Sequence, residues 1–333
     1  GGGLAIGFSG IGSALAQRAN GEAAREVGVW VAIKPNDDIV VRMARTEMGQ
    51  GTITGLAQLV VEELEGDWKK VKWEYITPGV SHAKKRAWGD FGTGGSRGIG
   101  AAAARACARR GQGVVLTYQR DAQAAAAVQR EVEALGERAV ALQLDVGQVE
   151  RFAGFREQVQ QALADTWGVS QLAGLVNNAG MGLFNPIAQV SEAQFDELFR
   201  VHLKGPFFLT QALLPLLARG AAIVNVSSGA ARLGSPGEYI DYAASKGALD
   251  TMTTGLAKEV AREGIRVNAV RPGLIDTEIH ASGGLPNRAK ELAHLAPMQR
   301  PGTAEEVAES VVWLLSDAAS YVTGSLINVG GGR

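Results

Sequence analysis

The chain has 333 residues, enough for one large domain or two ordinary ones. Hydrophobic residues at 46% and charged residues at 20% exclude a disordered chain and a coiled coil. Because 33 Lys and Arg residues balance 34 Asp and Glu residues, no basic field favours nucleic acid as a partner. The one cysteine, Cys107, allows neither an intrachain disulfide nor a thiolate zinc site, so we expect no metal and a reducing, cytoplasmic compartment.

The N-terminal stretch at residues 4–16 consists mainly of small and apolar residues. Two interpretations stay open for it, the remnant of an export signal and an ordinary loop followed by a helix. The stretch is too short to span a membrane, and no other stretch reaches the roughly 18 uncharged apolar residues of a transmembrane helix. We therefore expect no membrane partner.

The pattern of predicted strands and helices in residues 1–92 differs from that in the residues that follow. Strands are predicted at residues 29–33 and 39–44, on either side of a turn, and at residues 71–76. Apolar residues at helical spacing predict a helix at residues 53–64. We expect a small α+β fragment here.

From residue 93 onward, short Val- and Ile-rich runs alternate with alanine-rich helices. The runs lie at residues 113–117, 139–144, 174–177, 223–227 and 265–270. This alternation predicts an α/β fold with a doubly wound parallel sheet and helices on both faces. We take residues 93–333 as one domain.

A glycine-rich loop, Thr-Gly-Gly-Ser-Arg-Gly-Ile-Gly at residues 93–100, precedes an alanine-rich helix. Such a loop brings backbone amides and a helix N-terminus close to a pyrophosphate, although alone it is weak evidence. Further motifs follow the predicted strands: Leu-Asp-Val at 144–146, Asn-Asn-Ala-Gly at 177–180, Ser-Ser at 227–228 and Arg-Pro-Gly at 271–273, with Tyr-Ala-Ala-Ser-Lys at 242–246. Doubly wound sheets bind ligands at these strand ends.

Together the motifs resemble the short-chain dehydrogenase/reductase family over residues 93–333. The resemblance implies a Rossmann-type fold, a homodimer or homotetramer, and an NAD(P)-dependent oxidoreductase that interconverts an alcohol and a ketone or aldehyde. It implies contacts to the cofactor from Gly94, Ser96, Arg97, Gly98, Ile99, Gly100, Asp145, Val146, Asn178, Ala179, Gly180, Tyr242, Lys246, Pro272, Gly273, Ile275 and Thr277. One departure is Gly330, where the family usually has Asp.

The catalytic chemistry is argued from the residues. Reduction of a carbonyl leaves charge on oxygen, so a proton donor must lie close to it, and a tyrosine phenol suits this if a cation lowers its pKa. Tyr242 and Lys246 are four residues apart and share one face of a helix, whereas the competing Tyr239 is followed at that spacing by an alanine. Ser228 is expected to orient the substrate oxygen, with Ser227 as the weaker alternative.

His202 replaces the asparagine that the family commonly has in its proton relay. An imidazole both accepts and donates hydrogen bonds and titrates near neutral pH. Two interpretations stay open, a catalytic relay through water and a packed helix residue.

The choice between NAD(H) and NADP(H) depends on the end of the second strand. A carboxylate there would bind the 2'-hydroxyl of NAD, but the position holds Tyr118. Arg97 and Arg120 can pair with a 2'-phosphate, so NADP(H) is favoured, although Asp121 lies close by.

Residues 45–64 resemble the molybdopterin-binding subunit of isoquinoline-type oxidoreductases and aldehyde dehydrogenases. The Gly-Gln-Gly turn at residues 49–51 would place Gln50 near the molybdenum centre. The resemblance extends to about residue 92 and joins the other at residues 93–99. Since the remaining contacts of such a subunit are missing, we expect no molybdopterin.

The join puts Gly-Asp-Phe-Gly, residues 89–92, where the buried central strand should read as an apolar run. Burying Asp90 without a partner costs several kcal/mol, and the two glycines pack poorly. Two hypotheses therefore stand: an NADP(H)-dependent oxidoreductase, and a non-catalytic or weakly folded chimera with at most residual nucleotide binding.

Overall fold

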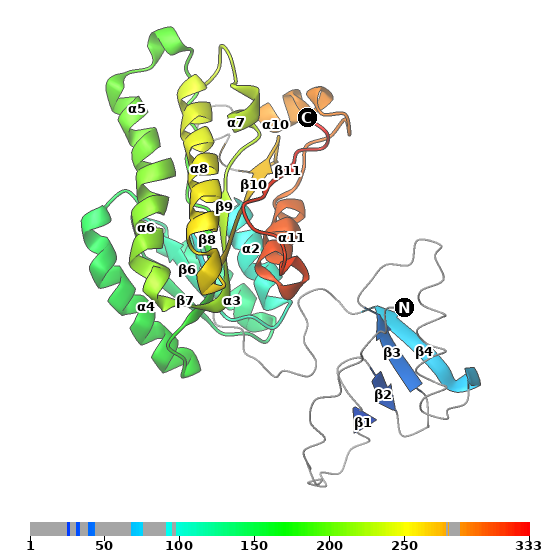
Figure 1. Cartoon of the computed structure of the whole chain (residues 1–333). Helices are drawn as coiled ribbons and strands as arrows, with labels where there is room; N and C mark the ends of the chain where they lie inside the picture. The colour runs from blue at the N-terminus through cyan, green and yellow to red at the C-terminus, as the bar shows by residue number, and fades with distance from the viewer. Residues whose placement is uncertain are drawn as a thin grey trace. The chain divides into compact units, whose positions relative to one another are not determined.

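The computed structural model describes residues 25–26, 31–33, 39–43, 68–75, 91–94, 98–277, 279 and 287–333 (Figure 1). The chain divides into two units, Gly1–Ile76 and Thr77–Arg333, and each is treated by itself. Neither residues 4–16 nor the helix expected at residues 53–64 lies among the described residues.

The first unit contains a four-stranded sheet. Its strands are β1 (Arg25–Glu26), β2 (Val31–Ile33), β3 (Ile39–Met43) and β4 (Val71–Tyr75), in that order, with a short 3₁₀ turn at Trp68–Lys70. β2 is antiparallel to both of its neighbours, β1 and β3, whereas β4 runs parallel to β3. The three strands predicted in this part of the chain are thus confirmed.

The second unit is built on a seven-stranded sheet in which all neighbouring strands are parallel. Its order is β11-β10-β9-β8-β5-β6-β7, so the winding direction reverses between β5 and β8. The strands are β5 (Phe91–Gly94), β6 (Val114–Tyr118), β7 (Ala139–Gln143), β8 (Leu172–Asn177), β9 (Leu217–Val226), β10 (Arg266–Pro272) and β11 (Leu326–Val329). This confirms the predicted doubly wound sheet.

Helices cover both faces of this sheet (Figure 1). They are α2 (Gly98–Ala108), α3 (Ala122–Ala134), α4 (Phe152–Trp167), α5 (Glu192–Phe199), α6 (Gly205–Leu213), α7 (Ala230–Leu233), α8 (Ile240–Glu259), α10 (Arg288–Glu291) and α11 (Ala304–Leu315). A π-helical turn, Arg200–Lys204, joins α5 to α6. Shorter 3₁₀ turns lie at Val149–Arg151, Ile187–Gln189, Leu214–Leu216, Ala261–Glu263, Ala293–Leu295 and Asp317–Ala319.

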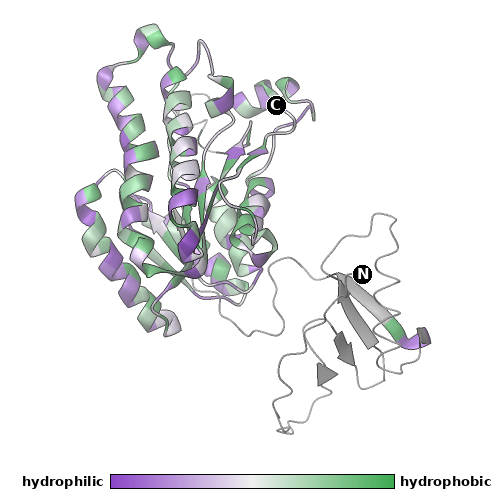
Figure 2. Cartoon of the chain, in the orientation of Figure 1, coloured by the Kyte–Doolittle hydropathy of each residue, from purple (hydrophilic) through white to green (hydrophobic). Residues whose placement is uncertain are grey.

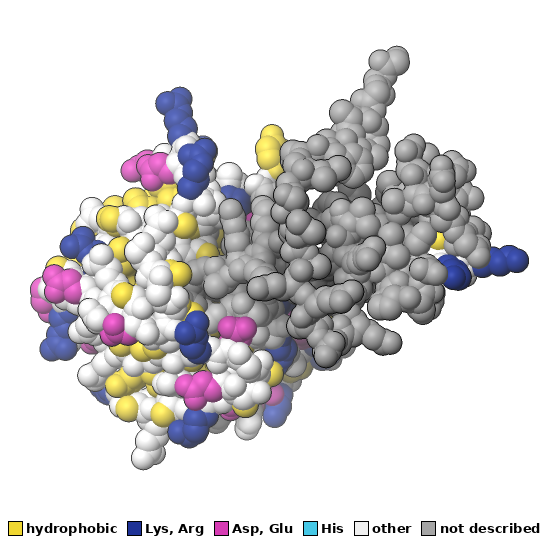
Figure 3. Space-filling view, turned by 90° about the horizontal axis from the view of Figure 1, so that it is seen from below, with side chains coloured by type: hydrophobic (Ala, Val, Ile, Leu, Met, Phe, Trp, Pro, Cys, Tyr) yellow, Lys and Arg dark blue, Asp and Glu magenta, His cyan; other side chains and the backbone are white. Residues whose placement is uncertain are grey.

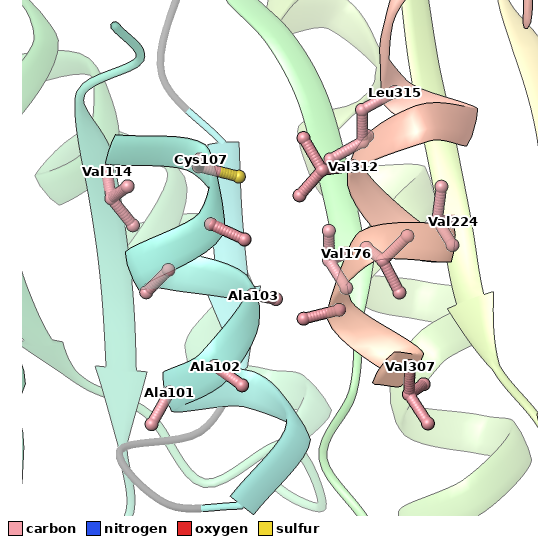
Figure 4. Packing of buried hydrophobic residues seen from close by; sticks show 14 of the residues in the cluster. Ala101, Ala102, Ala103, Cys107, Val114, Val176, Val224, Val307, Val312 and Leu315 are labelled. Carbon is pink, nitrogen blue, oxygen red and sulfur yellow. The ribbon is translucent and has the colours of Figure 1, made fainter. Parts of the chain in front are cut away.

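Two buried clusters hold the helices to the sheet. On one face, the small alanines of α2 allow close approach to Val307 and Val312 of α11 (Figure 4). On the other face, Phe155 of α4 and Leu213 of α6 belong to a second cluster. Figure 2 shows hydrophobic and hydrophilic residues alternating along α4, as in a helix with one face in water.

The charged side chains of the described surface are dispersed. On the face shown in Figure 3, Lys and Arg are interspersed with Asp and Glu, in line with the formal net charge of -1. Within the described helices, none is long and apolar enough to cross a membrane.

The strand at the join differs from its expected position. The expected strand covers residues 89–92, but β5 runs from Phe91 to Gly94, so Thr93 and Gly94 end a strand rather than begin a loop. Asp90 lies outside the described residues. β5 nevertheless holds the expected central place, paired with β6 and β8.

Candidate active site

A cleft of about 680 Å³ opens at the carboxyl ends of the parallel strands, at the point where the winding direction reverses. This is where doubly wound sheets bind ligands. The cleft is lined by most of the site residues expected from the sequence: Gly98, Ile99, Arg120, Asp145, Val146, Asn178, Ala179, Gly180, Ser228, Tyr242, Lys246, Pro272, Gly273, Ile275 and Thr277. Gly100 is buried within α2, while Ser96 and Arg97 lie outside the described residues.

The start of α2 forms one wall of the cleft. Gly98 has a φ of +54°, a conformation that glycine adopts without strain. A side chain there would begin 3.6 Å from Thr277, so the two sides of the cleft approach closely at this point. The free N–H groups and the dipole at the start of α2 suit an anionic group such as a pyrophosphate.

Asp145 follows β7 and lines the cleft. Its Oδ1 accepts a hydrogen bond from the N–H of Gly147 at 2.8 Å and lies 3.8 Å from Nη1 of Arg200. Burial raises the pKa of Asp145, but the Gly147 hydrogen bond and charges including Arg200 outweigh it, so that pKa is lowered. A Cβ at position 147 would overlap Arg200 at 1.5 Å, so a side chain there would displace this arginine.

The end of β6 carries the groups that bear on cofactor choice. Tyr118 and Arg120 line the cleft, and Arg120 is exposed. Asp121, the nearby acid, caps α3 by accepting a hydrogen bond from the N–H of Ala124 at 2.9 Å. Its carboxylate is therefore engaged by the protein.

Helix α8 brings Tyr242 and Lys246 to the cleft, and β9 ends beside them. Ser228 is hydrogen-bonded to the phenol of Tyr242, whereas Ser227 donates to the backbone carbonyl of Lys246 at 3.3 Å. The geometry thus puts Ser228, the favoured serine of the pair, next to the phenol.

The pKa of the phenol differs from the sequence-based expectation. Burial raises the pKa of Tyr242 to about 12, against the lowering influence of Ser228 and of the Arg288 charge. The ammonium of Lys246 donates to the carbonyl of Val226 at 2.9 Å and lies 5.9 Å from the Tyr242 ring centroid. Burial also lowers the pKa of Lys246 to about 8, although the Asp250 charge opposes this. Lys246 is not among the groups that shift the pKa of this phenol, so the lowering expected from the lysine is not seen.

His202 lies behind the cleft wall, fully buried in the π-helical turn. The N–H of Met181 donates to its Nε2 at 3.0 Å, and its Nδ1 lies 3.0 Å from Oγ of Ser245. Since Oγ of Ser245 donates to the carbonyl of Tyr242 at 2.7 Å, Nδ1 of His202 carries the proton. Burial, then the Lys246 charge, lower the pKa of His202 well below its usual value. The imidazole is neutral and both nitrogens are engaged by protein groups.

Asp250 extends the functional face of α8 by one turn and is missed by the sequence motifs. Its Oδ2 accepts from Nε and Nη2 of Arg271 at 2.9 and 2.8 Å. Among the described residues, no partner is found for Oδ1, which is buried. The signal available in the sequence is its position four residues after Lys246.

Phe184, Glu238, Tyr239 and Arg288, here called the arginine cluster, stand at the other end of the cleft. The guanidinium of Arg288 lies 5.1 Å from the ring centroids of both Phe184 and Tyr239. Its Nη2 donates to Oε2 of Glu238, and to Oη of Tyr239 at 3.2 Å. No local sequence motif predicts that Arg288 lies in the cleft, because its two hydrogen-bond partners are 50 and 49 residues away in the chain.

Comparison with known proteins assigns the class. The family model described as enoyl-(acyl carrier protein) reductase matches residues 92–333. A second model, the molybdopterin cofactor-binding domain, matches residues 1–173. In the overlap from residue 92, the structure has the strands and helices of the seven-stranded unit.

Individual relatives agree with this class. An uncharacterised oxidoreductase of Escherichia coli K12, YgfF, is 47% identical over 248 residues, covering 72% of this chain and 98% of its own. Versicolorin reductase 1 of Dothistroma septosporum is 33% identical over 251 residues, covering 72% and 93%. The chain belongs to the short-chain dehydrogenase/reductase family of NAD(P)-dependent oxidoreductases, preceded by a fragment of a molybdopterin cofactor-binding domain.

Solved structures show the same fold. The angucycline C-6 ketoreductase LanV with bound NADP matches with a TM-score of 0.70 and 32% identity, covering 73% of this chain and 95% of its own. A short-chain dehydrogenase from Burkholderia cenocepacia J2315 in complex with NADP matches with a TM-score of 0.68 and 30% identity, covering 74% and 99%.

Proposed function

We propose that the chain is an NADP(H)-dependent carbonyl reductase in which Tyr242 gives a proton to the substrate oxygen. The observation that carries this proposal is the meeting of Ser228, Tyr242 and Lys246 at one point of the cleft. A phenol with a pKa of about 12 keeps its proton at neutral pH, as the proton donor in carbonyl reduction must.

The cleft fits a nicotinamide dinucleotide along its length. Gly98 at the start of α2 would hold the pyrophosphate, and Asp145 would accept a hydrogen bond at the adenine. A Cβ at Gly180 would lie 3.6 Å from Nζ of Lys246, so the glycine keeps the space beside the ammonium open. When bound, the cofactor supplies the hydride that the carbonyl carbon accepts.

Each residue around the reacting oxygen has a separate role. The hydroxyl of Ser228 holds the oxygen near the phenol, and Tyr242 transfers the proton. Within the described part of the chain Lys246 makes one hydrogen bond, to Val226, so its other N–H groups are available for ribose hydroxyls. His202 acts as a positioning residue, fixing the backbone of Tyr242 through Ser245.

NADP(H) is favoured over NAD(H) for two reasons. The carboxylate of Asp121 caps α3 and does not line the cleft, so it is not placed to select the 2'-hydroxyl of NAD. Arg120 lines the cleft and suits a 2'-phosphate, and the two solved relatives named above hold NADP. Arg97 is proposed as a second phosphate contact.

For the rest of the chain, we propose that the join between the two family resemblances, expected between residues 92 and 93, lies inside β5, and that the N-terminal fragment binds no molybdopterin. The structural division of the chain falls earlier, between Ile76 and Thr77. Gln50 and its turn lie outside the described residues. We also propose a homodimer or homotetramer in the cytoplasm, as the family resemblance implies. The alternative, a chimera that turns nothing over, rests on the glycine-rich β5.

The test is a panel of ketones and aldehydes with the full chain and NADPH, followed by absorbance of the reduced cofactor. Turnover of at least one carbonyl compound, lost in Tyr242→Phe and kept in Tyr321→Phe, supports the proposal. Tyr321 is a suitable control because it is fully exposed. No turnover of any compound, together with no NADPH binding up to millimolar concentration, would favour the inert chimera.

A further inference from the structure

The arginine cluster lies next to the proposed proton donor. The ring of Tyr239 is 5.3 Å from that of Tyr242, and Phe184, Tyr239 and Arg288 all line the cleft. Arg288 is only 5% exposed. Burying a guanidinium costs free energy unless its N–H groups find hydrogen-bond acceptors.

The charge of Arg288 is only partly compensated. The hydrogen bonds that it makes with described residues both use Nη2, which leaves Nε and Nη1 for a ligand. The side chain of Glu238 is 43% exposed against 6% for Arg288, so water screens the carboxylate more than the guanidinium. The aromatic rings of Phe184 and Tyr239 hold the planar group by cation–π contact.

Apart from Glu238, the charged residues that line this end of the cleft are positive. Among the described residues that line the cleft, the acids are Asp145 and Glu197, and both are grouped with Arg200. Near Tyr242 the charged lining residues are Lys246, Arg271 and Arg288, of which Arg271 is neutralised by Asp250. This end of the cleft therefore favours an anion.

The loop before α8, which carries Glu238 and Tyr239 of the arginine cluster, has a strained backbone at Ser235. Ser235 lines the cleft with a φ of +48°, and its carbonyl accepts from the N–H groups of Glu238 and Tyr239. A non-glycine residue in this conformation is strained, and such strain is often found at ligand sites.

From these contacts we propose that Arg288 binds a carboxylate of the substrate, so that the enzyme reduces carbonyl compounds that also carry a carboxylic acid. Nε and Nη1 lie on different edges of the guanidinium, so a ligand oxygen would accept from one of them. A singly charged carboxylate suits one such charged donor better than a phosphate, which usually needs more donors. The inference rests on the proposed function for its reaction, but not for its binding.

The first test measures binding without turnover. Calorimetry compares 2-naphthoate with its neutral isostere 2-naphthamide on the full chain, with and without NADPH. We expect naphthoate to bind at least tenfold more tightly, and the ratio to fall to about one in Arg288→Met. Equal affinities in the wild type, or a preference that survives in Arg288→Met, would overturn the proposal.

Glu238→Gln separates binding from a structural role, and it keeps the test valid if Arg288→Met unfolds. Removing the competing carboxylate should raise the naphthoate preference about threefold or more. If Arg288 only holds α10 against the loop of Glu238 and Tyr239, Glu238→Gln should leave the preference for naphthoate unchanged or lower it. Either result contradicts the proposal.

A turnover arm then connects the site to the reaction. The ratio of kcat/KM for 4-acetylbenzoate to that for 4-acetylbenzamide should exceed ten in the wild type and approach one in Arg288→Met, mainly through KM. If NADPH does not bind, the proposed function fails, while the naphthoate measurement on the chain alone still decides the carboxylate site. A ratio near one in the wild type contradicts the carboxylate proposal alone.

Discussion

The two ends of the cleft are built in different ways. The cofactor end consists of strand ends and the start of α2, where short motifs such as Leu-Asp-Val and Asn-Asn-Ala-Gly bring their own residues together. The substrate end is the arginine cluster, whose members come from separate loops and from α10. The first is encoded locally, whereas the second depends on tertiary contacts; in our proposals the first binds the cofactor and the second selects the substrate.

Tyr242 stands where the two ends meet, so its removal should have the largest effect. Tyr242→Phe keeps the ring and its contact with His202 but removes the transferable proton. General acid catalysis contributes about 10² to 10⁴ in rate, so we expect kcat to fall about 10³-fold, with the NADPH dissociation constant changed less than threefold. Steady-state kinetics and fluorescence titration measure the two quantities. A kcat within tenfold of wild type would reject the proton-donor role.

The pH profile should report the cofactor end alone. With a pKa of about 8, Lys246 loses its charge as pH rises, whereas Tyr242 with a pKa of about 12 stays protonated. The kcat/KM for NADPH should be constant below about pH 7 and fall about tenfold per unit well above pH 8, because it reports the free enzyme. A profile that stays flat to pH 10 would show that the charge of Lys246 is not needed.

Arg120→Ala should weaken only the cofactor end. An exposed arginine–phosphate contact contributes about 1 to 1.5 kcal/mol, or roughly tenfold in affinity for NADPH. The dissociation constant for NADH should not change, which brings the two cofactors closer together. Arg130→Ala is the control, since Arg130 is exposed on α3 and outside the cleft. Equal losses for NADPH and NADH in Arg120→Ala would contradict the phosphate role.

The smallest expected effect concerns the scaffold under both ends. Gly92 of β5 is paired with Val115 and Leu175, which both line a cavity of about 30 Å³. Register partners point to the same face of a sheet, so we expect a methyl group at position 92 to lie on the face of Val115 and Leu175. Gly92→Ala should stabilise the fold by about 1 kcal/mol through burial and reduced chain entropy, raising the urea midpoint.

Gly205→Ala is the matched control for this substitution. A Cβ at Gly205 would lie 2.4 Å from the carbonyl oxygen of Val146, which is backbone and cannot move aside, so this variant should be less stable. A lower midpoint for Gly92→Ala would mean that β5 has no room on that face.

The sequence predicts the fold well because the period of apolar runs reports buried strands directly. The order of motifs likewise predicts the cofactor end, since parallel strands deliver their carboxyl ends to one edge. The environment of a side chain is harder to predict: the pair Tyr242 and Lys246 is found from its spacing, but their burial, which raises one pKa and lowers the other, is a tertiary property. Arg288 could not be found, because its setting exists only after folding. At the join, the residues Phe-Gly-Thr-Gly form strand β5, which is paired with β6 on one side and with β8 on the other.

The proposed function requires that this chain, with its glycine-rich β5, binds NADPH in the cleft. Titration of the full chain with NADPH, followed by cofactor fluorescence, tests this directly, with NADH and Lys246→Ala as comparisons. We predict a micromolar dissociation constant for NADPH, an affinity at least tenfold weaker for NADH, and loss of binding in Lys246→Ala. No saturation up to millimolar NADPH would contradict the account and leave the inert chimera as the better description.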